Sequence, residues 1–336
     1  MNQPNPSPGV PRGSEGFPTE QYWARFTPPW SRYRMTFRIL TEGVAPASPY
    51  VAWRGTFGRA LRQLVCGCRA SDGSHRPDCA FSFLFETPIP KGIIPGSSTL
   101  HGPHPLFFSR LGLVPSAELV PGQSFAVEIV LVGPARYQSY TVLAALERLG
   151  DMGLGRQRIR FRLEEVAQWS ETEWRKSLGT PGEGRLALAP LLGGHWSIKT
   201  IEPVVLRRNG RLLQPAELSF REWVVAIVRR LTELTSLYGT IEPNNELDQS
   251  SLFAAADSVK LGVRDYRIIS RQRFSKRQGQ SHPLTGISGS FEVDGDLEPF
   301  GPLFRLGELF HIGKSIAFGL GQFEVEALSD PPQGEP

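Results

Sequence analysis

Apolar residues in this chain follow two spacings, one typical of strands and one typical of helices. Segments rich in β-branched and aromatic residues, with partial alternation, predict strands. These are residues 33–41, 124–132, 156–163, 197–206, 263–274, 286–293 and 322–326. Apolar residues that recur every three to four positions predict amphipathic helices over residues 51–65, 140–149, 215–238 and 303–312. The pair Asn209-Gly210 predicts a hairpin turn.

One combination of elements occurs twice, about 160 residues apart. In the first copy, a predicted strand follows residues 146–150 and the motif Gly153-Leu154-Gly155. In the second copy, a predicted strand follows residues 303–307 and the motif Gly319-Leu320-Gly321. Two similar endings of helix, glycine loop and strand indicate a duplicated domain. Each half can be written as strand, helix, two strands, helix and strand, which is the ferredoxin-like unit. The sequence therefore predicts an α+β protein of two tandem ferredoxin-like (RRM-like) βαββαβ domains.

The composition divides the chain into four parts. Residues 1–30 are rich in proline, glycine and serine and predict a disordered tail. Residues 31–180 are expected to form an N-terminal ferredoxin-like domain with a cysteine-containing loop. Residues 190–328 are expected to form a C-terminal ferredoxin-like domain with a glycine-rich loop, and residues 329–336 a second tail.

Length and charge bound the classes of function. The chain has 336 residues, of which 40% are hydrophobic, and this is enough for two domains. Its net charge of +4 allows a nucleic-acid partner without requiring one. No run approaches about 18 apolar residues, so neither a membrane span nor a membrane partner is expected. Three cysteines without a secretion signal favour reduced thiols and a cytoplasmic location.

A glycine-rich loop lies between the last predicted helix and the last predicted strand. Gly313, Gly319 and Gly321 allow positive φ angles and close approach of another backbone. Lys314 adds a cation, so exposed amides beside it favour a phosphate ligand. A P-loop is excluded, because Gly-Lys-Ser here precedes the glycine pair and follows a helix. Nucleotide hydrolysis is therefore rejected.

Several motifs follow one another in an order that carries more information than any of them alone. They are residues 54–66, Phe83-Leu84-Phe85-Glu86-Thr87-Pro88, Ile269-Ser270-Arg271-Gln272, Asp294-Gly295-Asp296-Leu297, Leu306-Gly307-Glu308 and His311-Ile312-Gly313-Lys314. This set resembles the CRISPR-associated repeat-RNA (pre-crRNA) processing endoribonucleases of the RAMP superfamily. The resemblance covers most of residues 33–327.

The resemblance implies an endoribonuclease that cleaves precursor transcripts into guide RNAs and requires no metal or other cofactor for catalysis. A ribose 2′-hydroxyl would attack the neighbouring phosphate and give a 2′,3′-cyclic phosphate and a 5′-hydroxyl. Such a reaction needs proton transfer at both oxygens and cations near the phosphorane. The implied partners are CRISPR repeat RNA and other subunits of a CRISPR effector complex.

Histidine suits the proton transfers near neutral pH, and lysine suits the developing charge. The family usually places its catalytic histidine on or near the first helix, but residues 51–65 contain none. We therefore assign catalysis to His311, beside the glycine-rich loop, and to Lys314. The alternative for His311 is a residue at a helix C-terminus that interacts with the helix dipole. His101 and His104, in a Pro-Gly loop, are the next candidates.

RNA binding is assigned first to a basic stretch, residues 267–277, which contains no acid and has aromatic residues interleaved. Together with the loop glycines and two arginines of the first helix, the assigned residues are Arg267, Arg271, Arg273, Lys276, Arg277, Gly313, Gly319, Gly321, Arg54 and Arg62. The alternative for the stretch is a solvated edge. Residues 156–163 predict a second basic strand face, with four arginines at alternate positions, and it allows the same two interpretations.

Cys66, Cys68, His75 and Cys79 form the pattern Cys-x-Cys-x6-His-x3-Cys. These are zinc ligand types within fourteen residues, so one hypothesis is a structural zinc that holds this loop. The other is three reduced, partly buried thiols, because the spacing departs from that of standard zinc fingers.

Two other functions stay open. A non-catalytic RNA-binding RAMP subunit of a CRISPR effector complex would bind repeat RNA without cleaving it. A small-molecule-binding protein with ferredoxin-like repeats would show no salt-dependent affinity for RNA.

Overall fold

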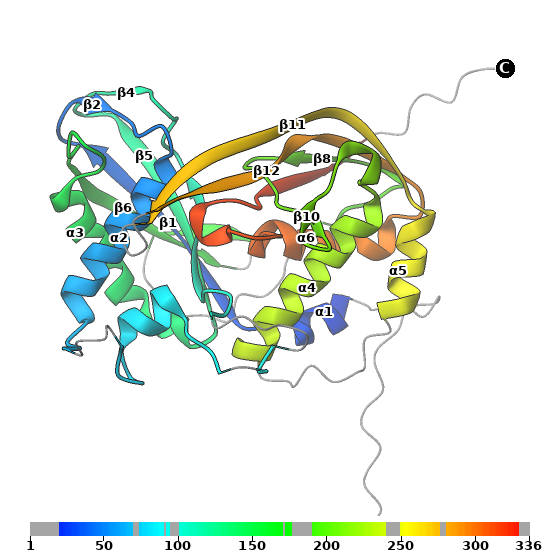
Figure 1. The fold of residues 1–336 in the computed structure, drawn as a ribbon, viewed down its shortest axis with the longest axis horizontal. Coiled ribbons are helices and arrows are strands. Elements are labelled where there is room, and N and C mark those ends of the chain that lie inside the picture. Colours follow the sequence, from blue (N-terminus) through cyan, green and yellow to red (C-terminus); the bar gives the residue numbers. More distant parts are fainter. Residues whose placement is uncertain are drawn as a thin grey trace, which may run out of the picture.

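The computed structural model describes residues 20–69, 74–90, 92–94, 101–170, 172–176, 190–239, 249–275 and 280–328. In this part of the chain, each half forms a βαββαβ unit around one antiparallel sheet (Figure 1). The predicted α+β fold of two tandem ferredoxin-like units is confirmed. Within the described ranges, no helix combines the length and the apolar character needed to cross a bilayer.

The first sheet has the strand order of a ferredoxin-like unit with one added edge strand. Its order is β3 (Leu106–Leu111), β5 (Ser124–Val132), β1 (Trp30–Ile39), β6 (Phe161–Ser170) and β7 (Glu173–Arg175). Helices α2 (Pro49–Val65) and α3 (Ser139–Met152) cover one face of this sheet. Between them and the sheet, the ring of Trp53 stacks on Phe161 with centroids 5.3 Å apart. Apolar residues at helical and strand spacing thus meet in one core.

The second sheet repeats this order. It consists of β11 (Lys260–Ser275), β12 (Gln280–Asp294), β8 (His195–Thr200) and β13 (Phe323–Ala327). Helices α4 (Phe220–Tyr238) and α6 (Gly301–Phe310) pack on one face, and α5 (Gln249–Ser258) lies beside α4. The ring of Phe220 stacks on Phe304 between the two helices, with centroids 5.0 Å apart.

Shorter elements connect these units. The helical turns are η1 (Ser82–Glu86, a π-helix), η2 (Gly133–Gln138), η3 (Pro215–Glu217), η4 (Glu298–Phe300) and η5 (Ile316–Phe318). The short ladders pair β2 (Gly43–Val44) with β4 (Glu118–Leu119), and β9 (Arg207–Arg208) with β10 (Arg211–Leu212). The turn between β9 and β10 is Asn209-Gly210, with φ of 51° and 80°, as the sequence predicts.

The predicted disordered tail is wrong for residues 20–30. They form helix α1 (Glu20–Phe26) and the start of β1. Tyr22, Trp23 and Phe26 are buried in the core of the second half, and Trp23 is fully enclosed. The burial of three aromatic rings offsets the entropy of ordering this segment, which a composition of proline and glycine alone does not reveal. The remainder of that tail and the short C-terminal tail lie outside the described residues.

The predicted strand with four arginines on one face is also wrong at its start. Residues 155–158 form a turn, closed by two hydrogen bonds between the backbones of Leu154 and Ile159, and β6 begins only at Phe161. Arg158 has a φ of 51°, which no strand residue adopts. The alternating pattern therefore reflects a turn followed by a strand, and the arginines do not share a face.

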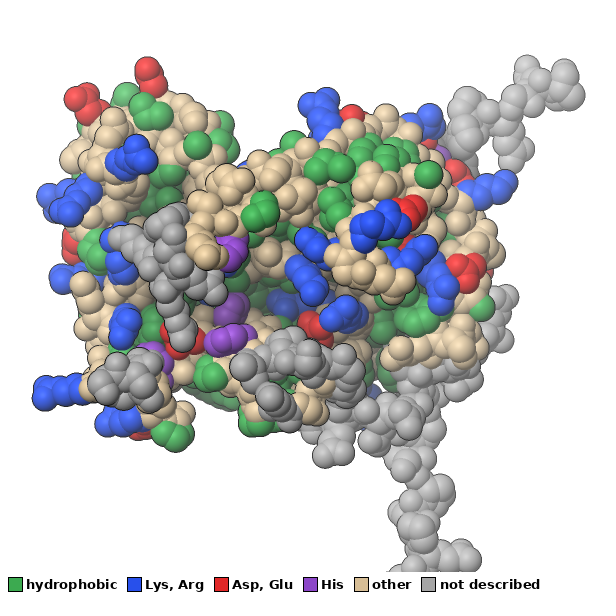
Figure 2. Space-filling model, viewed as in Figure 1, with side chains coloured by type: hydrophobic (Ala, Val, Ile, Leu, Met, Phe, Trp, Pro, Cys, Tyr) green, Lys and Arg blue, Asp and Glu red, His purple; other side chains and the backbone are tan. Residues whose placement is uncertain are grey.

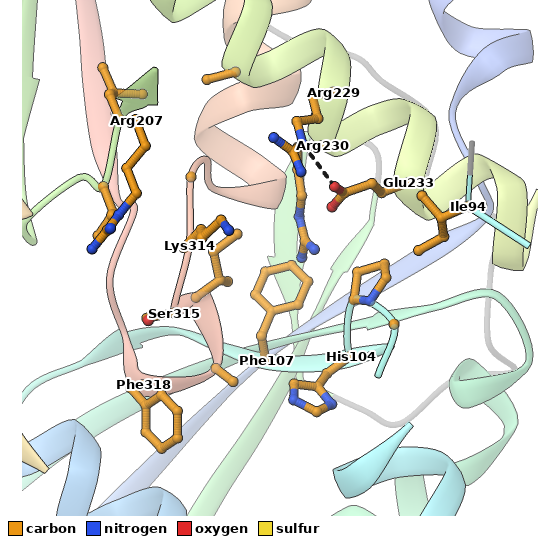
Figure 3. A pocket seen from close by; sticks show the side chains of 18 of the residues that line it. Ile94, His104, Phe107, Arg207, Arg229, Arg230, Glu233, Lys314, Ser315 and Phe318 are labelled. Carbon is orange, nitrogen blue, oxygen red and sulfur yellow. Dashed lines mark hydrogen bonds and ion pairs between the residues drawn. The ribbon is translucent and has the colours of Figure 1, made fainter. Parts of the chain in front are cut away.

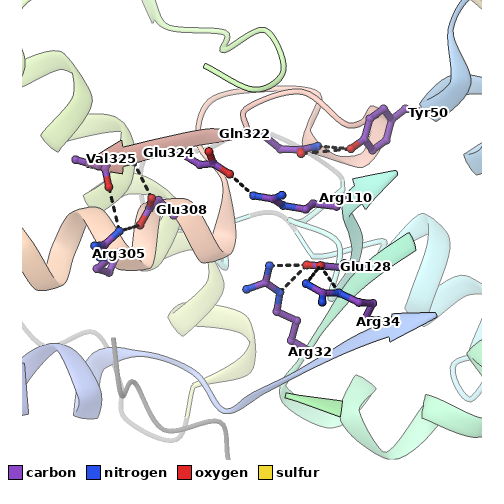
Figure 4. A network of polar contacts seen from close by, with 10 residues as sticks. All are labelled: Arg32, Arg34, Tyr50, Arg110, Glu128, Arg305, Glu308, Gln322, Glu324 and Val325. Atoms are coloured by element: carbon purple, nitrogen blue, oxygen red, sulfur yellow. Dashed lines mark hydrogen bonds and ion pairs between the residues drawn. The ribbon is translucent and has the colours of Figure 1, made fainter. Parts of the chain in front are cut away.

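The hydrophobic core of the second half extends into the first half, and polar contacts also join the two halves (Figure 4). Residues of the first sheet that belong to the core of the second half are Trp30, Phe107, Val130 and Val132. Near the glycine-rich loop, Gln322 Nε2 donates a hydrogen bond to Tyr50 Oη at 2.9 Å, and Arg110 pairs with Glu324. The glycine-rich loop is thus held against the first half.

Candidate active site between the two halves

A cavity of about 520 Å³ lies between the halves, where the glycine-rich loop meets the loop before β3. Its wall from the first half contains His101, His104 and Phe107. Its wall from the second half includes Arg207, Arg229, Arg230, Lys314, Ser315 and Phe318 (Figure 3). In the space-filling view, histidines and basic side chains gather around a hollow between the halves (Figure 2). The fold thus brings imidazoles and cations together from segments about 200 residues apart.

The glycine-rich loop is fixed by contacts within the protein. Gly313, Gly319 and Gly321 have φ of 79°, 86° and 88°. A Cβ atom on Gly319 would lie 2.2 Å from the ring of Tyr50, so glycine allows this close approach. The amides of Gly319 and Gly321 each donate to a backbone carbonyl at 2.9 Å. These two amides are occupied, which argues against the predicted direct contact with an RNA phosphate.

Lys314 is the exposed cation of the loop, and it lines the cavity. Among the described residues, no carboxylate forms an ion pair with it. The acids of the cavity have other partners, since Arg229 Nε binds Glu233 at 3.0 Å and Arg208 pairs with Glu222. The Lys314 ammonium is therefore in position to bind an anion that enters the cavity.

His311 is placed where it cannot reach a ligand. It ends helix α6 with a φ of 58°, and only 2% of the residue is exposed. Its ring meets the edge of Phe107, with centroids 5.2 Å apart, and it does not line the cavity. Burial, and next the charge of Arg230, lower the pKa of His311 well below its ordinary value. The catalytic assignment to His311 therefore needs correction, because the residue fills the junction between the halves.

Replacing His311 by leucine should remove part of the acid sensitivity of the protein without loss of catalytic groups. The folded state holds this imidazole neutral, whereas the unfolded chain binds a proton below about pH 6.5. The native stability from this residue is present above that pH and falls as pH decreases, by at most about 1.4 kcal/mol per unit. Urea unfolding at pH 7 and pH 5.5 should show a smaller loss for the variant than for the wild type. Equal losses would contradict the neutral, buried state of His311.

His101 has a defined tautomer at the edge of the cavity. Its Nδ1 donates a hydrogen bond to the carbonyl oxygen of Glu86 at 2.9 Å, because a carbonyl can only accept. The proton is thereby fixed on Nδ1 and the lone pair on Nε2, which is the form that a general base requires. His101 is also exposed to solvent.

His104 differs from His101 in that protein groups bind both ring nitrogens. Thr87 Oγ1 donates to the carbonyl of Phe83 and therefore accepts from His104 Nδ1 at 2.9 Å. Arg54 Nη2 donates to His104 Nε2 at 3.3 Å. Burial, followed by the charge of Arg54, lowers the pKa of His104 well below its ordinary value. His104 is therefore a neutral part of the cavity wall.

Arg54, predicted to bind RNA, instead connects the halves. It donates to the carbonyl of Phe85 at 3.0 Å, and its guanidinium lies over the rings of Phe85 and Phe318. Burial lowers its pKa to about 9. Arg273 of β11 also lies over Phe318, 4.1 Å from the ring centroid. Arg62 is exposed on α2 and does not line the cavity.

The basic residues of the stretch on β11 lie in different environments. Arg271 Nη1 binds Glu202 Oε2 at 2.6 Å and is half-buried. Arg267 is exposed near an aspartate of the same strand. Two further predicted members, Lys276 and Arg277, lie outside the described residues. Within the described part, Arg273 is the member that approaches the glycine-rich loop.

Four side chains of the types that ligate metal ions converge on one point in the first half. One ligand atom from each of Cys66, Cys68, His75 and Cys79 lies within 4.8 Å of the other three. His75 Nδ1 is 3.5 Å from both Cys66 Sγ and Cys79 Sγ. The cluster could hold a structural metal ion, and its four residues are those selected from the spacing of the sequence.

Glu86 and Thr87 position the two histidines of the cavity, although sequence reasoning assigns them no role. Glu86 supplies the carbonyl that binds His101, and Thr87 supplies the hydroxyl that binds His104. Both belong to the motif of residues 83–88, so the signal was present in a motif that served only for the resemblance.

Comparisons with known proteins divide the chain as its fold does. A family model described as AF_1859_N, N-terminal domain, matches residues 26–191. A second, described as CRISPR-associated endoribonuclease Cas6, matches residues 198–323. No curated protein sequence matches the chain.

Solved structures support the fold over most of the chain. A Cas6 product complex has a TM-score of 0.52 and 14% identity, and the match covers 88% of this chain and 99% of that one. A partial Cas6-RT-Cas1–Cas2 complex has a TM-score of 0.57 and 11% identity, and the match covers 90% of this chain and 47% of that longer one. The predicted resemblance to CRISPR-associated repeat-RNA processing endoribonucleases is confirmed for residues 198–323, which match the Cas6 endoribonuclease model.

Proposed function

We propose that this chain, whose second half carries the domain of the CRISPR-associated endoribonuclease Cas6 family, binds CRISPR repeat RNA and cleaves precursor transcripts into guide RNAs. The observation that carries the proposal is the cavity between the halves, which His101 and Lys314 both line. An imidazole and a lysine without a described acidic partner supply a proton acceptor and a cation for phosphate. Neither group needs a metal ion for this chemistry.

The proposed reaction begins at the ribose on the 5′ side of the scissile phosphate. His101 Nε2 accepts the proton of the 2′-hydroxyl while the 2′-oxygen attacks the phosphorus. The bond from phosphorus to the 5′-oxygen breaks, and the leaving oxygen takes a proton from water. The products are a 2′,3′-cyclic phosphate and a 5′-hydroxyl. Lys314 binds a non-bridging oxygen, where negative charge develops in the transition state.

The RNA is proposed to approach along the hairpin of β11 and β12. This hairpin extends from the second half across to α2 of the first half (Figure 1). Arg273 and Phe318 lie where it meets the glycine-rich loop. Arg267, Lys276 and Arg277 stay proposed contacts to the RNA backbone, which such cations hold without regard to sequence.

The ion of the four-residue cluster is proposed to be zinc. Three thiolates and one imidazole are a common donor set of structural zinc sites, and four protein ligands leave no open position for a substrate. The zinc would therefore support the fold, while cleavage itself requires no metal.

A non-catalytic RNA-binding subunit is the second candidate. It is favoured by the composition of α2, the first helix of the first ferredoxin-like unit. This helix carries no histidine, and its buried Arg54 already binds groups of the protein. Such a subunit would bind repeat RNA as tightly as the enzyme but would leave it intact.

Cleavage of a repeat RNA in EDTA should separate the two candidates. We expect cleavage to persist in the chelator and to stop at a site whose ribose lacks the 2′-hydroxyl, because the nucleophile is then missing. The deoxy RNA should bind with nearly the affinity of the unmodified RNA in a filter-binding assay. Binding without cleavage of the unmodified RNA would favour the non-catalytic subunit, and cleavage of the deoxy site would exclude attack by the 2′-oxygen.

A further inference from the structure

The geometry of the cysteine and histidine cluster matches one tetrahedral ion. Zinc bonds of about 2.3 Å to sulfur and about 2.0–2.1 Å to nitrogen place those two atoms about 3.6 Å apart in a tetrahedron. The distance from His75 Nδ1 to Cys66 Sγ, and to Cys79 Sγ, is 3.5 Å. The amide of Arg76 also donates to Cys68 Sγ at 3.4 Å, a contact that orients this sulfur.

The cluster is also connected to a carboxylate outside the four ligands. His75 Nε2 lies 3.4 Å from Glu86 Oε2, on the side of the ring opposite Nδ1. A histidine that ligates a metal through one nitrogen commonly donates the other N–H to a carboxylate, and this fixes the ring. Glu86 thus occupies the position of such a partner.

The π-helix η1 links the cluster to the cavity. Cys79 lies just before η1, and Glu86 is its last residue. Three successive residues at this end accept hydrogen bonds, one from Arg54 and two from histidines that line the cavity. Phe85 accepts a hydrogen bond from Arg54, Glu86 accepts one from His101, and Thr87 accepts one from His104. Glu86 therefore contacts both sites. Its carboxylate lies near His75, and its backbone carbonyl accepts a hydrogen bond from His101.

We propose that Cys66, Cys68, His75 and Cys79 bind one zinc ion, and that Glu86 transmits the position of this ion to His101. A single π-helical turn has no stability of its own, so its end must be held by other contacts. The ion holds Cys79 before the turn, and the His75–Glu86 pair holds its last residue. Glu86 is then a positioning residue for the histidine of the cleavage reaction. The second part of this inference rests on the function proposed above.

The first experiment measures metal and local order. Protein purified without chelator should contain about one zinc per chain, and the double variant Cys66→Ser, Cys79→Ser should contain none. Zinc removal should increase hydrogen exchange of residues 82–87 and of the loop beginning at His101, as measured by mass spectrometry. Absence of zinc from the wild type would overturn the metal site, whatever the activity of the protein.

The second experiment uses Glu86→Ala, which keeps all four ligands and so does not depend on the folding of the cysteine variant. Metal sites lose about 10- to 100-fold in affinity without such a partner, so zinc should stay bound when it is supplied in excess. Single-turnover cleavage should fall by about 10-fold or more with RNA affinity unchanged, because this proposal gives the carboxylate a contact with His75 and none with RNA. Glu86→Gln should restore much of the rate, since its amide oxygen still accepts from His75.

A matched control is Glu147→Ala, which removes an exposed carboxylate of α3. This variant should change neither the cleavage rate nor the hydrogen exchange at His101. If Glu86→Ala changed neither the cleavage rate nor the hydrogen exchange at His101, the proposal that Glu86 links the zinc ion to His101 would be wrong. Zinc binding with the expected exchange changes, but without cleavage by the wild type, would instead reject the proposed function and keep the structural link.

Discussion

His101→Ala should slow cleavage of repeat RNA by about 10²- to 10⁴-fold, the usual scale of a lost general base. The affinity for the RNA should change little, because a neutral imidazole contributes little to phosphate binding. The reason lies in the hydrogen bond from Nδ1 to the Glu86 carbonyl, which leaves the lone pair of His101 on Nε2. Single-turnover kinetics together with filter binding would separate the two effects.

A matched control is His195→Ala. That histidine lies on β8, pairs with Asp294 and does not line the cavity, so its removal should leave the rate unchanged. Full activity of His101→Ala, or an equal fall in rate and affinity, would remove His101 from the chemistry.

Lys314→Ala should reduce both rate and affinity. Its ammonium binds the ground-state phosphate and also the charge of the phosphorane, so we expect a loss of about 10²- to 10³-fold in rate, as for other electrostatic contacts of a transition state. The slope of log affinity against log salt should become shallower by about 0.7 if one single-stranded phosphate contact is lost. Lys314→Arg should retain most of the affinity, because the charge is kept.

The control for this variant is Lys260→Ala, at the end of β11 away from its hairpin turn. It has the same change in net charge and should show a nearly unchanged salt slope. If Lys260→Ala weakened binding as much as Lys314→Ala, net charge and not the position of Lys314 would control RNA binding. A Lys314→Ala variant with normal rate would place the scissile phosphate elsewhere.

The two variants test different halves of the molecule. His101 comes from the loop before β3, and Lys314 from the loop after α6, so neither half contains the proposed site alone. Changes that open the junction should therefore reduce cleavage even when both side chains are present. The pair Tyr50–Gln322 is one contact on which this arrangement depends.

Local patterns determined the elements of this protein. The apolar spacing of residues 124–132 and 140–149 is enough to predict β5 and α3, because each spacing matches the geometry of a single element. The turn at Asn209-Gly210 was equally predictable, because this turn needs a positive φ angle at two successive residues and few residue pairs other than Asn-Gly allow it. The spacing of cysteine and histidine also predicted the four residues that converge, because side chains of one short loop stay near one another.

Only the tertiary structure decided which groups face the cavity. His311 and Lys314 are three residues apart in the same loop, yet one packs against Phe107 of the first half and the other lines the cavity. Trp23 and its neighbours looked like part of a polar tail because the core that buries them is formed by the second half of the chain. Burial depends on partners distant in sequence, and no local pattern contains them. The sequence therefore predicted the fold and the chemical groups, while the packing of the two halves placed His101, and not His311, at the cavity.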